Sequence, residues 1–141
     1  MGYPPELAAG CLAMFSELAR GAVSRRDRKL ATLSIAARLR SGYEWGHHAP
    51  SAATVDISSD EVQAIRTGAR GILSDADQLV VDYAVAVEEH DVSDGLWARM
   101  SEVFDTEQLV QLTALAAMYG FNSRVQSALR VDQDTGLAAD F

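Results

Sequence analysis

Residues 105–130 read DTEQLVQLTALAAMYGFNSRVQSALR and decide the fold class. One row of apolar residues recurs at helical spacing in this stretch, and a second apolar row lies beside it. The rows are Leu109, Leu112, Ala116 and Tyr119, and Val110, Ala114, Ala117 and Phe121. This pattern predicts one long helix that is apolar on two sides. Such a helix is central in its fold or lies at an oligomer interface.

Helix-start signals recur along the rest of the chain. A serine or aspartate followed three residues later by an acid or an amide can cap a helix N-terminus. Four pairs fit this pattern: Ser24 with Asp27, Ser58 with Glu61, Ser74 with Asp77, and Asp105 with Gln108. Together with the apolar spacing they predict helices near residues 5–20, 24–40, 43–50, 58–67, 74–89, 93–103 and 105–130, with Pro50 bending the third. We therefore predict an all-α single domain of six to seven helices over residues 1–131, and a mobile tail at 132–141.

Composition and charge exclude several classes of function. The 141 residues carry 20 acidic and 12 basic side chains, a formal charge of −8. Seven basic and four acidic residues precede position 51, whereas five basic and sixteen acidic residues follow it. This balance argues against nucleic acid as a partner, because phosphate contacts need positive charge. No apolar run is long enough to span a membrane, and the sequence has a single cysteine, Cys11. We therefore expect a soluble cytoplasmic protein.

Residues 43–50, YEWGHHAP, hold the side chains best suited to chemistry. Glu44 and His48 are four residues apart and Glu44 and His47 three apart, so either imidazole can meet the carboxylate on one face of a helix. A carboxylate beside an imidazole is a workable pair for proton transfer. The alternative is an ordinary pair on a helix surface that adds a little stability.

Three further groups admit a functional and a structural interpretation. Tyr43 and Trp45 can wall a substrate pocket or pack in the core. The isolated guanidinium of Arg124 can bind a substrate carboxylate or form a salt bridge. Arg25, Arg26, Arg28 and Lys29 form a basic cluster that reads as a solvated face or an inter-subunit patch rather than an anion site. We expect no metal site, because zinc prefers three or four ligands, and we place Cys11 in the core.

The succession Tyr43-Glu44-Trp45-x-x-His48-x-x-x-Ala52, then residues 57–65 and later Tyr119-x-x-x-x-Arg124, resembles the carboxymuconolactone decarboxylase family. This family also contains the alkylhydroperoxidase D-like proteins. The resemblance covers roughly residues 7–131 and implies an all-α homo-oligomer (dimer, trimer or hexamer) with its site near a subunit interface. The alkylhydroperoxidase branch carries Cys-x-x-Cys-x-x-x-His, and aligning its histidine on His48 puts Ser41 and Glu44 at the cysteine positions and Lys29 at an upstream glutamate.

Because both thiols are absent, the chain resembles the branch that lacks the cysteine pair, and disulfide-based peroxidase chemistry is excluded. The decarboxylase branch implies a lyase without cofactor that acts on a small carboxylated lactone or cyclic metabolite. In this hypothesis Glu44 and His48 exchange protons, while Tyr43, Trp45, His47 and Arg124 bind substrate. The alternatives are a hydrolase, isomerase or cyclase that uses the same pair, and a noncatalytic helical oligomer that binds a ligand.

Overall fold

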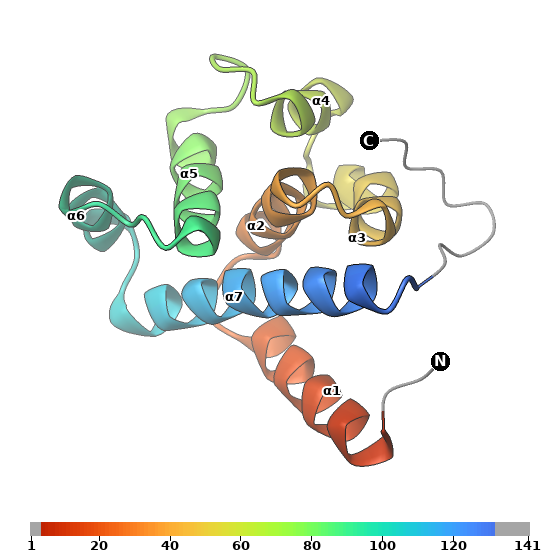
Figure 1. The fold of residues 1–141 in the computed structure, drawn as a ribbon. Helices are drawn as coiled ribbons and strands as arrows, with labels where there is room; N and C mark the ends of the chain where they lie inside the picture. Colours follow the sequence, from red (N-terminus) through yellow and green to blue (C-terminus); the bar gives the residue numbers. More distant parts are fainter. Residues whose placement is uncertain (1–3, 132–141) are drawn as a thin grey trace.

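The structure, a computed structural model, describes residues 4–131, in which helices are joined by short loops (Figure 1). The elements are α1 (Pro5–Arg20), α2 (Arg25–Arg38), α3 (Gly42–His48), the 3-10 helix η1 (Ala49–Val55), α4 (Ser59–Thr67), α5 (Asp75–Glu89), α6 (Asp94–Val103) and α7 (Thr106–Ala128). No strand occurs within residues 4–131, so the all-α prediction is confirmed. The predicted mobile tail, residues 132–141, lies outside the described residues.

The predicted capping residues start the helices. Capping boxes open α4, between Ser58 and Glu61, and α7, between Asp105 and Gln108. The Ser24 and Ser74 hydroxyls likewise accept the backbone N–H three residues on. Each cap satisfies an N–H group that the first helical turn leaves without a partner.

The region around Pro50 differs from the prediction of one bent helix. The α-helix α3 ends at His48, and the chain tightens into η1, where Pro50 lies in the first turn. A proline near a helix start loses nothing, because the first N–H groups of a helix have no internal acceptor. Two caps fall outside the four predicted pairs: the Ser41 hydroxyl accepts the Glu44 backbone N–H at the start of α3, and the Ser93 hydroxyl accepts the Leu96 backbone N–H at the start of α6.

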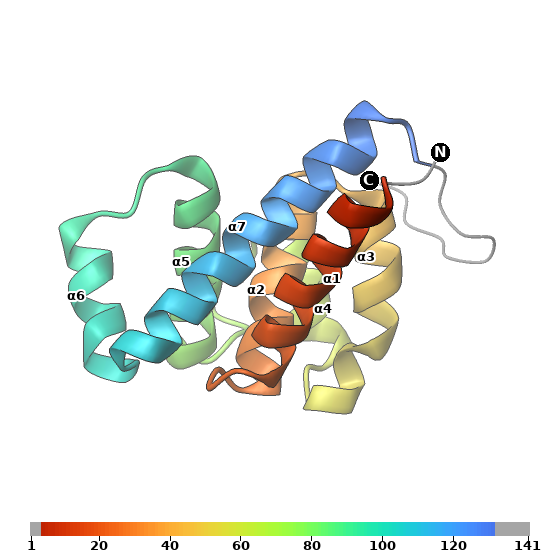
Figure 2. The same ribbon diagram turned by 90° about the horizontal axis from the view of Figure 1, so that it is seen from below.

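The central helix is α2, which contacts α3, α4, α5, α7 and η1. Its residues 30–36 are all buried, including the polar Thr32 and Ser34. Their hydroxyls donate to the carbonyl oxygens of Arg28 and Leu30, at 2.8 and 2.6 Å, so neither polar group is buried without a partner. Figures 1 and 2 show α2 in the middle with α7 crossing it, and α1 meets α7 and runs away from it in Figure 1.

The long helix α7 is buried on one side only. Leu109, Leu112 and Ala116, from the first predicted apolar row, are buried against the core, whereas Val110 and Phe121, from the second row, are 62% and 40% exposed. In the single chain these two members of the second row therefore face outward, whereas Ala114 packs against the core. No described helix, α7 included, is long and apolar enough to cross a membrane.

Arg26 joins three elements, which corrects the expectation that the basic cluster is simply a solvated face. Its guanidinium donates to both carboxylate oxygens of Asp77, at 3.1 and 2.9 Å, and to Glu61 Oε1 at 2.8 Å. It also reaches the Val55 carbonyl at the end of η1. The bond from Arg26 lowers the pKa of Asp77, while the Ser58 backbone N–H and then Arg26 lower the pKa of Glu61. Arg26 thus ties α2 to α4 and α5.

We expect Arg26→Ala to lower the free energy of unfolding by about 2 kcal/mol at pH 7, because two mostly buried carboxylates lose their counter-charge. Both carboxylates have lowered pKa values in the folded protein. Their contribution is therefore present above the ordinary values near 4 and is lost as the pH falls through the folded values. The difference from the unmodified protein should shrink toward pH 3.

Urea denaturation at several pH values measures this effect. Arg20→Ala is the matched control, because Arg20 and Glu17 form an exposed pair whose side chains are 69% and 77% accessible. Its loss should cost no more than about 0.5 kcal/mol. Equal effects of the two substitutions would show that Arg26 does not tie the helices together.

Candidate active site

The carboxylate of Glu44 lies buried between α3 and α7, with the residue only 3% exposed. Its Oε1 accepts hydrogen bonds from the side-chain amides of Asn122 and Gln126, the latter at 2.8 Å. Its Oε2 lies 3.5 Å from His48 Nε2. Two amides donate to Oε1 and an imidazole nitrogen lies beside Oε2, so both carboxylate oxygens have polar neighbours. The buried carboxylate is therefore compensated by α7 and by the end of α3.

His48 lies between this carboxylate and an amine. Its Nδ1 is 3.3 Å from Lys29 Nζ on α2, while Nε2 faces Glu44 on its other side. Lys29 Nζ also donates to the Ser51 hydroxyl at 2.9 Å. Burial lowers the pKa of Lys29, and the nearby charge of Arg25 acts in the same direction. An imidazole bridging an amine and a carboxylate provides a continuous path for a proton.

The aromatic ring of Tyr119 on α7 closes one side of this chain of groups. Its ring stands edge-on to the His48 imidazole, with centroids 5.3 Å apart, and Phe15 of α1 packs on it at 5.5 Å. Burial raises the pKa of Tyr119, as does the charge of Glu44, while a hydrogen bond with Thr32 opposes the shift. The site thus combines an apolar wall with charged groups, which strengthens electrostatic interactions inside it.

A pocket of about 560 Å³ opens onto these groups. It is lined by Phe15, Lys29, Tyr43, Glu44, His47, His48, Ser51, Tyr119, Asn122 and Gln126. The rings of Tyr43 and His47 lie beside each other at 4.5 Å. Gln126 Oε1 is buried without a hydrogen-bond partner among the described residues. The volume of the pocket suits a small metabolite.

The structure brings four of the six predicted site residues together, namely Tyr43, Glu44, His47 and His48. Trp45 does not line the pocket. It is 5% exposed, belongs to the hydrophobic core and lies under the Arg66 guanidinium, 5.8 Å from its ring centroid. Consecutive residues of a helix point about 100° apart, so Trp45 cannot share the direction of both neighbours.

Arg124 does not line this pocket, and its contacts match the second of its two predicted roles, a salt bridge. Its guanidinium binds both carboxylate oxygens of Glu88 on α5, with the longer contact at 3.4 Å. The Glu88 side chain is 5% accessible and needs this counter-charge. Arg124 therefore holds α7 to α5.

Sequence reasoning missed the partners of the Glu44–His48 pair. Asn122 and Gln126 were overlooked, although their spacing of four residues puts two amides on one face of the final helix. That spacing was the sequence signal by which the two amides could have been identified. For Lys29 the signal was its place in the sequence at the position of the upstream glutamate of the alkylhydroperoxidase branch.

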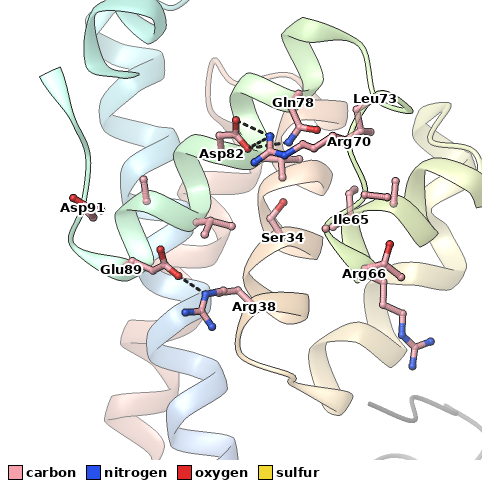
Figure 3. Close-up of a pocket in the computed structure, with 17 residues that line it drawn as sticks. Ser34, Arg38, Ile65, Arg66, Arg70, Leu73, Gln78, Asp82, Glu89 and Asp91 are labelled. Atoms are coloured by element: carbon pink, nitrogen blue, oxygen red, sulfur yellow. Dashed lines mark hydrogen bonds and ion pairs between the residues drawn. The ribbon is translucent and has the colours of Figure 1, made fainter. Parts of the chain in front are cut away.

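A second polar pocket of about 450 Å³ lies between α2, α4 and α5 (Figure 3). Its charged side chains face one another: Arg38 pairs with Glu89, and Arg70 with Asp82 at 2.7 Å. Charges already paired in this way leave little for a ligand to bind. We therefore place the candidate active site at Glu44 and His48.

The described residues hold no group of three or more His, Cys, Asp or Glu side chains arranged to bind a metal ion. Cys11 is half-buried on α1 and packs against the core.

The model of the carboxymuconolactone decarboxylase family matches residues 5–76, a span that includes Lys29, Glu44 and His48. The chain belongs to this family. With a single cysteine in the whole sequence, it lacks the Cys-x-x-Cys pair. No curated protein has a significant sequence match to the chain.

Solved structures show the alkylhydroperoxidase D-like fold. A protein of unknown function from Agrobacterium tumefaciens, described as an AhpD-type antioxidant defence protein, superposes with a TM-score of 0.83 at 14% identity, over 94% of this chain and 93% of its own. A peroxidase-related protein from Silicibacter sp. TM1040 gives 0.82 at 12% identity, over 95% and 73%. Another from Ralstonia eutropha JMP134 gives 0.82 at 14%, over 96% and 74%. At these identities the likeness concerns the fold.

If Arg124 is a structural tie, Arg124→Met should lower the free energy of unfolding by about 1–2 kcal/mol, because Glu88 is left buried without its partner. The double variant Arg124→Met/Glu88→Gln should recover most of that loss. Thermal and urea unfolding of both variants measure the effect. Unchanged stability together with weaker substrate binding would restore the role of substrate clamp.

Proposed function

We propose that the protein is a carboxy-lyase that acts on a small carboxylated lactone or cyclic metabolite, with Glu44 and His48 as its acid–base pair. The observation that carries the proposal is the buried Glu44 carboxylate, which His48 and two amides of α7 hold beside a pocket of about 560 Å³. Family membership supports a related activity.

The proposed reaction needs only proton transfer by groups of the chain. The bond between the ring carbon and the carboxyl carbon breaks and carbon dioxide leaves. The electron pair is delocalised into the conjugated carbonyl as a dienolate. A ring carbon then takes a proton from the His48–Glu44 pair, and solvent returns a proton to the pair through Lys29 or the pocket mouth. An apolar wall such as Tyr119 favours the step, because it disfavours the charged carboxylate relative to carbon dioxide.

A disulfide-based peroxidase is the competing reaction that the similar structures suggest. That reaction requires two thiols that alternate between a dithiol and a disulfide. The only thiol of the sequence, Cys11, packs against the core from α1, and the groups in the pocket are a carboxylate and an imidazole. These groups support proton transfer instead.

We expect the protein to release carbon dioxide from γ-carboxymuconolactone or a related carboxylated lactone, and His48→Ala and Glu44→Gln each to lose about 100-fold or more in kcat, the usual size of an acid–base contribution. Carbon dioxide release and absorbance, followed together, measure the turnover. His90→Asn is the matched control, because His90 is an exposed histidine outside the pocket, with the positive φ of 58° that asparagine tolerates.

Folded unmodified protein that releases no carbon dioxide from any of these lactones would remove the carboxy-lyase proposal. Full activity in both site variants would remove the roles of Glu44 and His48.

A further inference from the structure

Lys29 is the single lysine of the chain, and the other eleven of its 12 basic side chains are arginines. A guanidinium stays protonated in proteins, whereas a lysine amine can lose its proton and then act as a base or a nucleophile. The one position that carries an amine also lines the pocket of the candidate active site. This pocket therefore holds the only side-chain amine of the protein.

The surroundings of Lys29 favour the neutral form of its amine. Burial lowers the pKa of Lys29, and the charge of Arg25, four residues earlier on α2, acts in the same direction. Lys29 and Arg28 also line a second pocket of about 330 Å³, which has no aspartate or glutamate among its described lining residues. The Glu44 carboxylate lies on the far side of the His48 imidazole. A desolvated amine next to another cation is a typical lysine nucleophile.

The hydrogen bonds of Lys29 fit a neutral amine. Such an amine has two N–H bonds and one lone pair, whereas an ammonium group has three N–H bonds. Lys29 Nζ donates to Ser51 Oγ at 2.9 Å and lies 3.3 Å from His48 Nδ1. These two contacts account for both hydrogens of the neutral form, and neither partner is a carboxylate. The lone pair is then left for an electrophile in the pocket.

A carbonyl compound has space on two sides of this amine. Lys29 lines the pocket of about 560 Å³ and the second pocket of about 330 Å³, and Phe15 and Tyr119 line both. Burial raises the pKa of Tyr119, so its hydroxyl adds no negative charge near the amine. Aromatic walls of this kind exclude water, which protects an intermediate that water would hydrolyse.

We propose that Lys29 is a nucleophile that forms an imine with the ketone group of a 3-oxo carboxylic acid. The inference goes beyond the proposed lactone reaction, because a lactone carbonyl does not give an imine of this kind. It assigns a second reaction to the same site, in which the imine nitrogen accepts the electron pair in place of a carbonyl oxygen. His48 and Glu44 keep the task of proton transfer.

The reaction balances with water and one proton from solvent. The Nζ lone pair bonds to the ketone carbon, the ketone oxygen leaves as water with the two amine hydrogens, and a proton from His48 makes the nitrogen an iminium. The bond to the carboxylate carbon then breaks, carbon dioxide leaves, and the electron pair moves toward the nitrogen to give an enamine. The α-carbon takes a proton from the His48–Glu44 pair. Water hydrolyses the resulting iminium to the ketone and the free amine, and the proton released returns to His48.

Reductive trapping tests the imine. The probe is acetoacetate, and sodium cyanoborohydride reduces an iminium to a stable secondary amine. We expect one adduct per chain, located on Lys29 by intact mass and peptide mapping. Lys29→Arg keeps the positive charge but removes the amine, so this variant should lose the adduct. If it does not fold, Lys29→Gln gives the same comparison.

The matched control moves the single lysine to another position. The double variant Lys29→Arg/Arg20→Lys keeps the composition and places the amine on α1, where the Arg20 side chain is 69% accessible. Trapping there should be about tenfold or more slower at pH 7, because an exposed amine is mostly protonated. Arg25→Gln removes a charge that lowers the pKa of Lys29, so it should also slow trapping at pH 7, whereas Arg20→Gln should not.

Three results would overturn the imine: no adduct on the unmodified protein, equal trapping rates for a lysine at position 29 and at position 20, or carbon dioxide release from acetoacetate that persists in Lys29→Arg. Trapping needs no turnover. An adduct on Lys29 without carbon dioxide release from γ-carboxymuconolactone would leave the imine standing and remove only the lactone reaction. Carbon dioxide release from the lactone without any adduct would do the reverse.

Discussion

A carboxylate that is almost wholly removed from water needs hydrogen bonds or a counter-charge. Glu44 is such a carboxylate, and the candidate active site depends on it. Its compensation comes from Asn122 and Gln126 of α7 and from His48 at the end of α3. These contacts fix α3 against α7. They also hold the imidazole where its second nitrogen meets Lys29 of α2. One buried charge thereby orders residues from three helices around a pocket.

The fold was predictable where the signals are local. The Ser58 and Asp105 capping boxes lie where their spacing places them, because a cap and its partner are three residues apart. The place of α2 at the centre was not predictable. Its charged first turns and the buried Thr32 and Ser34 weaken the apolar pattern, and the hydroxyls become compatible with burial only through bonds to their own helix.

The site residues also differ in whether a local sequence signal could predict them. The spacing of Glu44 and His48 pointed to an acid–base pair, and the structure places the two side chains within 3.5 Å. The groups around them come from distant positions, such as Lys29, which only the packing of α2 against α3 brings near. Arg124 shows the opposite case. In the sequence Arg124 lies apart from other basic residues. In the structure it pairs with Glu88, which lies on the neighbouring helix α5.

Lys29 Nζ and Glu44 Oε2 face opposite nitrogens of the His48 imidazole, at 3.3 and 3.5 Å, and the three groups together define one path for a proton. Nitrogen-15 NMR of the neutral His48 imidazole tests it most directly, because the two ring nitrogens have different shifts when protonated. With Lys29 donating to Nδ1, the proton should reside on Nε2, facing Glu44, and Lys29→Met should weaken that preference. A proton on Nδ1 in the unmodified protein would contradict the account.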